Sequence, residues 1–151
     1  MSLLPQKGWK YWIPSLIWMG VIFLLSSDLF AASMTGSIVG KIVEFFFPSL
    51  AAPVIEEIHH AARKLAHVTV FALLSWFYLM GLVMEFAVIP RFSFKQALSA
   101  IFLAFLYALT DEGHQALSPT RTAAIADVGW DAVGATLMQI WLAARSRSRG
   151  G

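Results

Sequence analysis

The sequence contains no cysteine, and only 13% of its 151 residues are charged. Without cysteine the chain can form neither a disulfide nor a thiolate metal site. The scarcity of charge is unusual, because a soluble domain carries about 25% charged residues. The net charge is only +2, and the basic residues lie at the chain ends and in connectors rather than on one face. We therefore expect no nucleic-acid partner.

Apolar residues, by contrast, are abundant. They make up 58% of the chain, and the mean hydropathy is +0.69, which is typical of membrane proteins. We predict an all-α fold, an integral membrane four-helix bundle that forms a single domain over residues 1–151. The spans are expected at about 11–27, 65–84, 96–112 and 125–144. A helix needs about 20 residues to cross a hydrocarbon core roughly 30 Å thick, and these intervals approach or meet that length.

The first apolar segment has two interpretations. Basic residues, an apolar run and the small residues of SSDLFAAS also fit a cleaved signal peptide. However, Trp9, Trp12 and Trp18 are typical of an interfacial anchor beside a retained span. We therefore predict that this helix is kept and that the protein is multi-pass.

The distribution of basic residues predicts the orientation. With four spans, both termini and the second connector share one side of the membrane. That side carries most of the cations, namely Lys7, Lys10, Arg91, Lys95, Arg145, Arg147 and Arg149. The positive-inside rule then places both termini in the cytoplasm, and the polar stretch LTDEGHQALSPTR (109–121) faces outward.

The first outer loop contains the segment GSIVGKIVEFFF (36–47). Ser37, Lys41 and Glu44 fall on one helical stripe and the apolar residues on the other. This pattern predicts a short amphipathic helix lying in the outer interface. A second helix is expected to start at Pro53 and to run unbroken through HHAARKLAHV (59–68) into the second span.

Polar residues recur at helical spacing at the outer end of three spans. Residues three and four apart share one face of a helix. The stripes are His60, Arg63, Lys64 and His67 on the second span, Tyr107, Asp111, His114 and Gln115 on the third, and Asp127, Asp131 and Gly134 on the fourth. An intramembrane carboxylate costs roughly 2.5–3.5 kcal/mol, so these side chains should face inward and find partners. Small Gly134 would let a neighbouring helix approach closely.

Three motifs in this order resemble the VanZ-like membrane proteins. They are RKLAH (63–67), YALTDEGHQ (107–115) and the pattern R-x5-D-x3-D-x2-G (121–134), with Ser26 and Ser27 closing the first span. The resemblance covers all four spans. It implies a four-helix protein of the bacterial cytoplasmic membrane, in a family whose founding members are linked to low-level teicoplanin resistance. The family commonly carries an Asn in the second half of the last motif, and this chain instead has Asp131 at a neighbouring position, which adds a charge.

The first functional hypothesis is binding of an anionic envelope lipid or peptidoglycan precursor at an outward-facing polar pocket. Arginine and lysine would hold phosphate there. The candidate ligand-binding residues are Arg63, Lys64, His67, Asp111, Glu112, His114, Gln115, Arg121, Asp127 and Asp131. The carboxylates in this set outnumber Arg63, Lys64 and Arg121, which a simple anion site would not require.

Three other hypotheses stay open at this point. A membrane-embedded enzyme would use His67, Asp111 or His114 as catalytic groups, either as a metal-free acid–base pair of His67 with Asp111 or as ligands of a divalent metal. Asp111 and His114 can share a metal, whereas Glu112 points about 100° away. A transporter or proton relay is also compatible with buried His and Asp. Finally, the charges can simply pair and hold the helices together.

Overall fold

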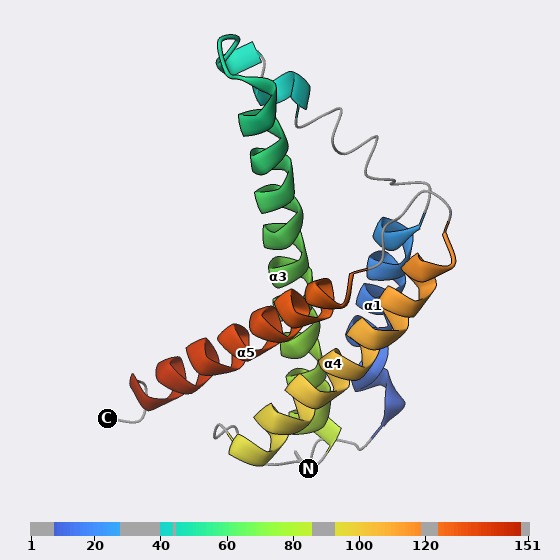
Figure 1. Cartoon of the computed structure of the whole chain (residues 1–151). Helices are drawn as coiled ribbons and strands as arrows, with labels where there is room; N and C mark the ends of the chain where they lie inside the picture. The colour runs from blue at the N-terminus through green and yellow to red at the C-terminus, as the bar shows by residue number, and fades with distance from the viewer. Residues whose placement is uncertain (1–7, 28–39, 44, 86–92, 119–123, 149–151) are drawn as a thin grey trace.

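The computed structural model describes residues 8–27, 40–43, 45–85, 93–118 and 124–148. Throughout these ranges the regular structure is helical, with no strand, which confirms the all-α prediction for the described part of the chain. The elements are a 3₁₀ turn, η1 (Trp9–Trp12), and the helices α1 (Ile13–Ser26), α3 (Ala52–Glu85), α4 (Phe94–Ala116) and α5 (Ile125–Ser148) (Figure 1).

Helix α1 follows directly from η1 and holds its proline at the start. Pro14 lies in the first turn, where a missing backbone N–H costs little because that group has no intrahelical partner. The helix ends at Ser26, and extended Ser27 donates its backbone N–H to Leu24 O at 3.1 Å. Together η1 and α1 cover nearly all of the predicted range 11–27.

Helix α3 is one unbroken helix of 34 residues, as predicted. At 1.5 Å per residue it is about 51 Å long, well beyond a hydrocarbon core of about 30 Å. Its N-terminal part rises past the other helices at the top of Figure 1. The RKLAH motif therefore lies in the interior of α3, not at its end.

Residues 40–43 and 45–46 form a short helical segment before α3. Ile42, Phe45 and Phe46 are 52%, 80% and 67% exposed, so the predicted apolar stripe is not covered by the rest of the described protein. Ser37 and Glu44 lie outside the described residues. The location of this segment in the membrane interface stays a prediction.

Among the described residues, three helical segments are long and apolar enough to cross a membrane: Trp9–Ser26, Ala52–Met84 and Phe94–Ala116. Helix α5 is not one of them. The chain is therefore a helical protein with three candidate spans. The fourth span, the four-helix bundle and the cytoplasmic termini remain predictions.

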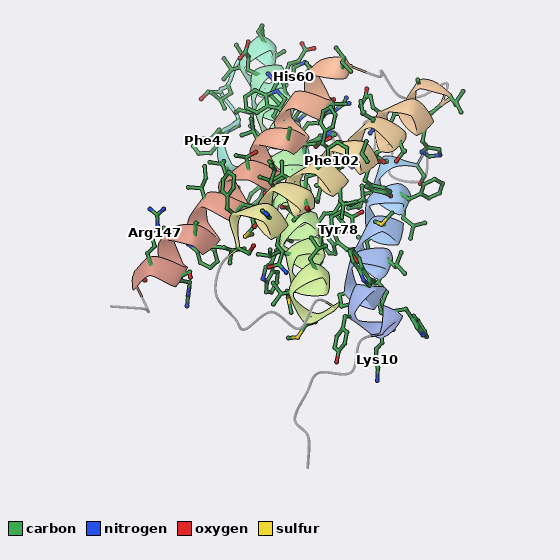
Figure 2. All side chains as sticks on the ribbon, turned by 90° about the horizontal axis from the view of Figure 1, so that it is seen from below. Lys10, Phe47, His60, Tyr78, Phe102 and Arg147 are labelled. Carbon is green, nitrogen blue, oxygen red and sulfur yellow. The ribbon has the colours of Figure 1, made fainter. Side chains whose placement is uncertain are left out.

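Helices α3 and α4 form the centre of the fold. Helix α3 packs against α1, α4 and α5, and α4 packs against α1 and α5. Ala100, Ala104 and Ala108 of α4 are fully or almost fully buried, and such small residues let neighbouring helices approach closely. Tyr78 lies between α3 and α1 in Figure 2, where its hydroxyl contacts Met19 Sδ at 3.2 Å.

The backbones of α5 and α3 approach each other closely near the polar residues, at Gly134 and Val68. A Cβ placed on Gly134 would lie 2.8 Å from the Cα of Val68, closer than real side chains tolerate. The obstacle is backbone, which cannot move aside as a flexible side chain can. Gly134 is therefore the residue that allows α5 to cross α3 here, as the sequence predicted.

Candidate functional site

Four helices bring polar side chains to one level of the fold. The end of α1 supplies Ser26, the end of α4 supplies Asp111 and the beginning of α5 supplies Asp131. The interior of α3 supplies His67, because α3 continues beyond the level at which the other helices begin or end (Figure 1). These residues and their neighbours form what we call the polar cluster: Ser26, Arg63, His67, Asp111, Glu112, Gln115, Asp127 and Asp131.

Within the polar cluster, side chains of α3 and α5 meet in two close contacts. Arg63 Nη2 donates to Asp127 Oδ2 at 2.8 Å, and His67 Nδ1 lies 2.9 Å from Asp131 Oδ1. His67 Nε2 is also 3.9 Å from Asp127 Oδ2. Arg63 and His67 are four residues apart on α3, and Asp127 and Asp131 are four residues apart on α5. The two contacts therefore lie one helical turn apart, and we call them two successive rungs. The Asp131 side chain is 2% exposed and that of Arg63 31%, so the rung that contains His67 is the more deeply buried.

A second set of contacts joins α1 to α4. Asp111 Oδ2 accepts hydrogen bonds from Ser26 Oγ at 2.8 Å and from Gln115 Nε2 at 2.9 Å. Asp111 is 3% exposed and Gln115 1%. Both donors are neutral, so neither contact is an ion pair.

Glu112 ties the end of α4 to the start of α5. Its Oε1 accepts the backbone N–H of Ala124, the residue before α5 begins. Glu112 is 8% exposed and has a different partner from Asp111. This agrees with the prediction that neighbouring positions 111 and 112 point in different directions.

Two predicted site residues lie beside the polar cluster without bonding to it. The His114 ring packs on Phe23 of α1, with ring centroids 4.3 Å apart and planes at 32°. Lys64 is exposed, and its Nζ lies over the Trp130 ring at 5.5 Å from the centroid. His60 is also exposed and lies 3.9 Å from Glu56 of its own helix.

Arg121, the remaining predicted cation of the site, lies outside the described residues. Its role as a phosphate ligand stays a prediction.

The predicted pairing of His67 with Asp111 is not what the structure shows. The carboxylate that faces His67 is Asp131, while Asp111 faces Ser26 and Gln115. The reason is the crossing of α3 over α5, which turns His67 towards α5. Helical spacing alone can identify the polar faces but cannot choose between two carboxylates on different helices.

A metal site gains no support from the geometry. Over the ranges that the structure describes, no three His, Asp or Glu side chains are arranged to hold a metal ion. The candidate metal ligands are separated, since His114 packs on Phe23 and His67 is bound to Asp131. The paired groups around Arg63 and His67 can hold protons and orient donors, but they do not form a coordination sphere.

Two polar contributions were missed at the level of sequence. Ser26 was noted only as part of the family resemblance, yet it donates to Asp111. Further along the α3–α5 contact, Gln139 Nε2 donates to Ser75 Oγ at 2.8 Å and to Ser75 O at 3.1 Å, with both residues buried. The available signal was simple: a Gln and a Ser inside apolar runs, where polar side chains need a partner.

Comparison with known proteins identifies a family without identifying an activity. Searches of curated proteins and of solved structures gave no match. The family model described as VanZ/LLP1 matches residues 11–144, a range that contains every residue of the polar cluster. The chain therefore belongs to the VanZ/LLP1 family.

Proposed function

We propose that this VanZ-like protein binds the head group of an anionic envelope lipid or lipid-linked cell-wall intermediate at its polar cluster. The observation that carries the proposal is the burial of four carboxylates, Asp111, Glu112, Asp127 and Asp131, at 2–8% exposure among apolar helices. Ionisable groups at membrane depth are expensive and usually mark a substrate or ion site. Simple helix association would require fewer of them.

The cations of α3 would contact the phosphate of such a lipid. Arg63 is partly exposed, and the adjacent Lys64 is exposed at the same level of the helix. A guanidinium offers paired donors to phosphate, and an ammonium adds charge. Arg121 is proposed as the third cation of this group.

We propose α5 as the fourth span, which would complete the four-helix bundle in the bacterial cytoplasmic membrane. Before its basic C-terminal turn, the buried side of α5 carries the polar residues Asp127, Asp131 and Gln139. Its exposed side is apolar, with Leu137, Ile140 and Trp141 all more than half exposed. This distribution is the reverse of a soluble helix and fits a helix that faces lipid. The average hydropathy of α5 is lowered by side chains that lipid would not contact.

The orientation and the physiological role extend this proposal. Arg145 and Arg147 at the end of α5 support a cytoplasmic C-terminus under the positive-inside rule. The polar cluster would then face outward. A link to teicoplanin-type resistance is carried over from the founding members of the family, and the lipid-binding site would be its physical basis.

The proposal is tested by identifying lipids that co-purify with the full chain in mild detergent. Native mass spectrometry should show an envelope lipid on the wild type, reduced on Arg63→Ala. Arg147→Ala is the matched control, because Arg147 points away from the bundle at the end of α5 (Figure 2). Equal retention by both variants, or no retained lipid on a folded wild type, would overturn the proposal.

A catalytic function is the second candidate, and the His67–Asp131 contact of 2.9 Å favours it. A histidine oriented by a buried carboxylate can act as a general base. The test is incubation of the protein with the lipid found above, followed by mass spectrometry of the products. Conversion that is lost in His67→Gln would support an enzyme. An unchanged lipid would leave binding as the function.

A further inference from the structure

The polar cluster contains two buried oxygen atoms that have no hydrogen-bond partner among the described residues, Asp111 Oδ1 and Gln115 Oε1. They belong to groups that are already joined, because Gln115 Nε2 donates to Asp111 Oδ2 at 2.9 Å. This bond also orients the amide, so that its nitrogen faces Asp111 and its oxygen points elsewhere. Both unpartnered atoms are acceptors. Buried polar groups normally have partners, so a donor is missing here.

The charge of the polar cluster indicates what kind of donor is missing. Asp127 and Asp131 are bound by Arg63 and His67. Asp111 has only the neutral donors Ser26 and Gln115 among the described contacts. Asp111 therefore has no cationic side chain among its described partners. A cationic donor would satisfy the open acceptors and pair with this carboxylate.

A primary ammonium fits these two oxygens better than a metal ion or a quaternary ammonium. A metal ion bound by oxygen takes about six ligands, and no group of three acidic or histidine side chains within the described ranges is arranged for one. A quaternary ammonium has no N–H to donate and is usually held by aromatic faces. A primary ammonium has three N–H donors and can use a carboxylate and an amide oxygen together.

An amide oxygen without a partner does not by itself indicate an ammonium site, because two other buried glutamines also have one. Gln96 and Gln139 also have Oε1 atoms with no partner in the described part of the chain. Their amide nitrogens donate to uncharged groups, Leu82 O and Ser75. Of these three glutamines, only Gln115 donates from its amide nitrogen to a carboxylate. That carboxylate, Asp111, also has an oxygen without a partner.

We propose that Asp111 and Gln115 bind a primary ammonium group of the lipid-linked ligand. This inference rests on the proposed function and narrows it: the ligand carries an ammonium group as well as phosphate, with phosphate near Arg63 and Lys64 and ammonium at Asp111. Both oxygens are closed to solvent, so binding of the ammonium requires the polar cluster to open locally. Two kinds of ligand carry such an ammonium group together with phosphate: an aminophospholipid, and a lipid-linked cell-wall precursor with a free amine.

The test compares lipids that differ only in the amine. Full-length protein in detergent is titrated with phosphatidylethanolamine, its trimethylated counterpart phosphatidylcholine, and phosphatidylglycerol, with bound lipid counted by native mass spectrometry. A lipid-linked muropeptide with its side-chain amine free or acetylated forms a second arm and distinguishes the two sources. We expect at least about tenfold tighter binding of a lipid with a free amine, because a polar site rejects analogues that cannot hydrogen-bond to it.

Variants test whether Asp111 is responsible for the preference. Asp111→Asn, nearly the same size, should bind all these lipids with similar affinity, and Gln115→Leu should reduce the preference independently. Glu56→Gln removes the same charge at an exposed position of α3 and should keep the preference. Equal wild-type affinity for lipids with and without the amine, or a preference that survives in both Asp111→Asn and Gln115→Leu, would overturn the ammonium site while leaving lipid binding intact. Failure of wild type to bind any of these lipids would instead overturn the proposed function.

Discussion

His67 and Asp131 join the interior of α3 to the beginning of α5 through a contact of 2.9 Å between Nδ1 and Oδ1. Asp131 is only 2% exposed, so losing His67 would leave a buried carboxylate without that partner. The contact lies beside the place where α5 crosses closest to α3, at Gly134 and Val68. The polar rung and the close helix crossing should therefore depend on each other.

A double-mutant cycle measures the energy of this contact. We expect His67→Ala and Asp131→Ala to be coupled by about 1–2 kcal/mol, towards the upper end of values for polar pairs between membrane helices. The measurement is reversible unfolding in mixed micelles of both single variants and the double variant. Additive free energies would show that the two side chains do not stabilise each other.

Asp131→Asn tests the charge separately from the hydrogen bond. Asparagine keeps an oxygen facing His67, so we expect this variant to lose less stability than Asp131→Ala, by roughly 1 kcal/mol or more. The same unfolding measurement in mixed micelles applies. Equal losses in the two variants would mean that the charge, not the hydrogen bond, supplies the stability.

Gly134→Ala should destabilise the protein, because its new Cβ would meet the backbone of Val68. We expect a loss of roughly 1–3 kcal/mol from overpacking, visible as a lower thermal midpoint in detergent. Gly129→Ala is the matched control in the same helix, where a Cβ would meet nothing within 4 Å. That variant should be neutral or stabilised by about 0.5–1 kcal/mol. Similar effects of the two substitutions would argue against the close crossing.

The absence of native cysteine makes the topology directly testable. Single cysteines are introduced at Leu117, which is 85% exposed just after α4, and at Ser148, the last residue of α5. In intact cells a membrane-impermeant maleimide should label Leu117→Cys and not Ser148→Cys, and permeabilisation should expose both. Labelling of both sites in intact cells would place them on one side and exclude α5 as a span.

The helices were largely predictable from the sequence, because membrane length and helical spacing constrain them strongly. The unbroken course of α3 through RKLAH was predicted, and the predicted ranges 96–112 and 125–144 lie inside α4 and α5. Helices α4 and α5 extend further than these ranges, to Ala116 and Ser148. The additional residues include His114 and Gln115 in α4 and Arg145 and Arg147 in α5, and a search for apolar runs stops before such residues.

The candidate site was predictable as a set of faces but not as a set of contacts. Helical spacing placed Asp127, Asp131 and Gly134 on one face of α5, and all three are buried. It also grouped His114 with Asp111 and Gln115, whereas His114 packs on Phe23. A stripe of positions spaced by three and four spans a wide arc of the helix. A side chain at the edge of such a stripe can meet different neighbours, depending on how the helices tilt and cross. A single sequence does not contain that information.

The close approach of Gly134 to Val68 is a point about which α3 and α5 would pivot if one helix rotated against the other. His67 is one residue from this point and Arg63 is five, so their lever arms along α3 are about 1.5 Å and 7.5 Å. Along α5, Asp131 and Asp127 lie about 4.5 Å and 10 Å from Gly134. A small rotation of one helix against the other would therefore separate Arg63 from Asp127 well before it strained His67 against Asp131. In such a rotation the Arg63–Asp127 contact would open first, and the His67–Asp131 contact would still join the two helices at their crossing.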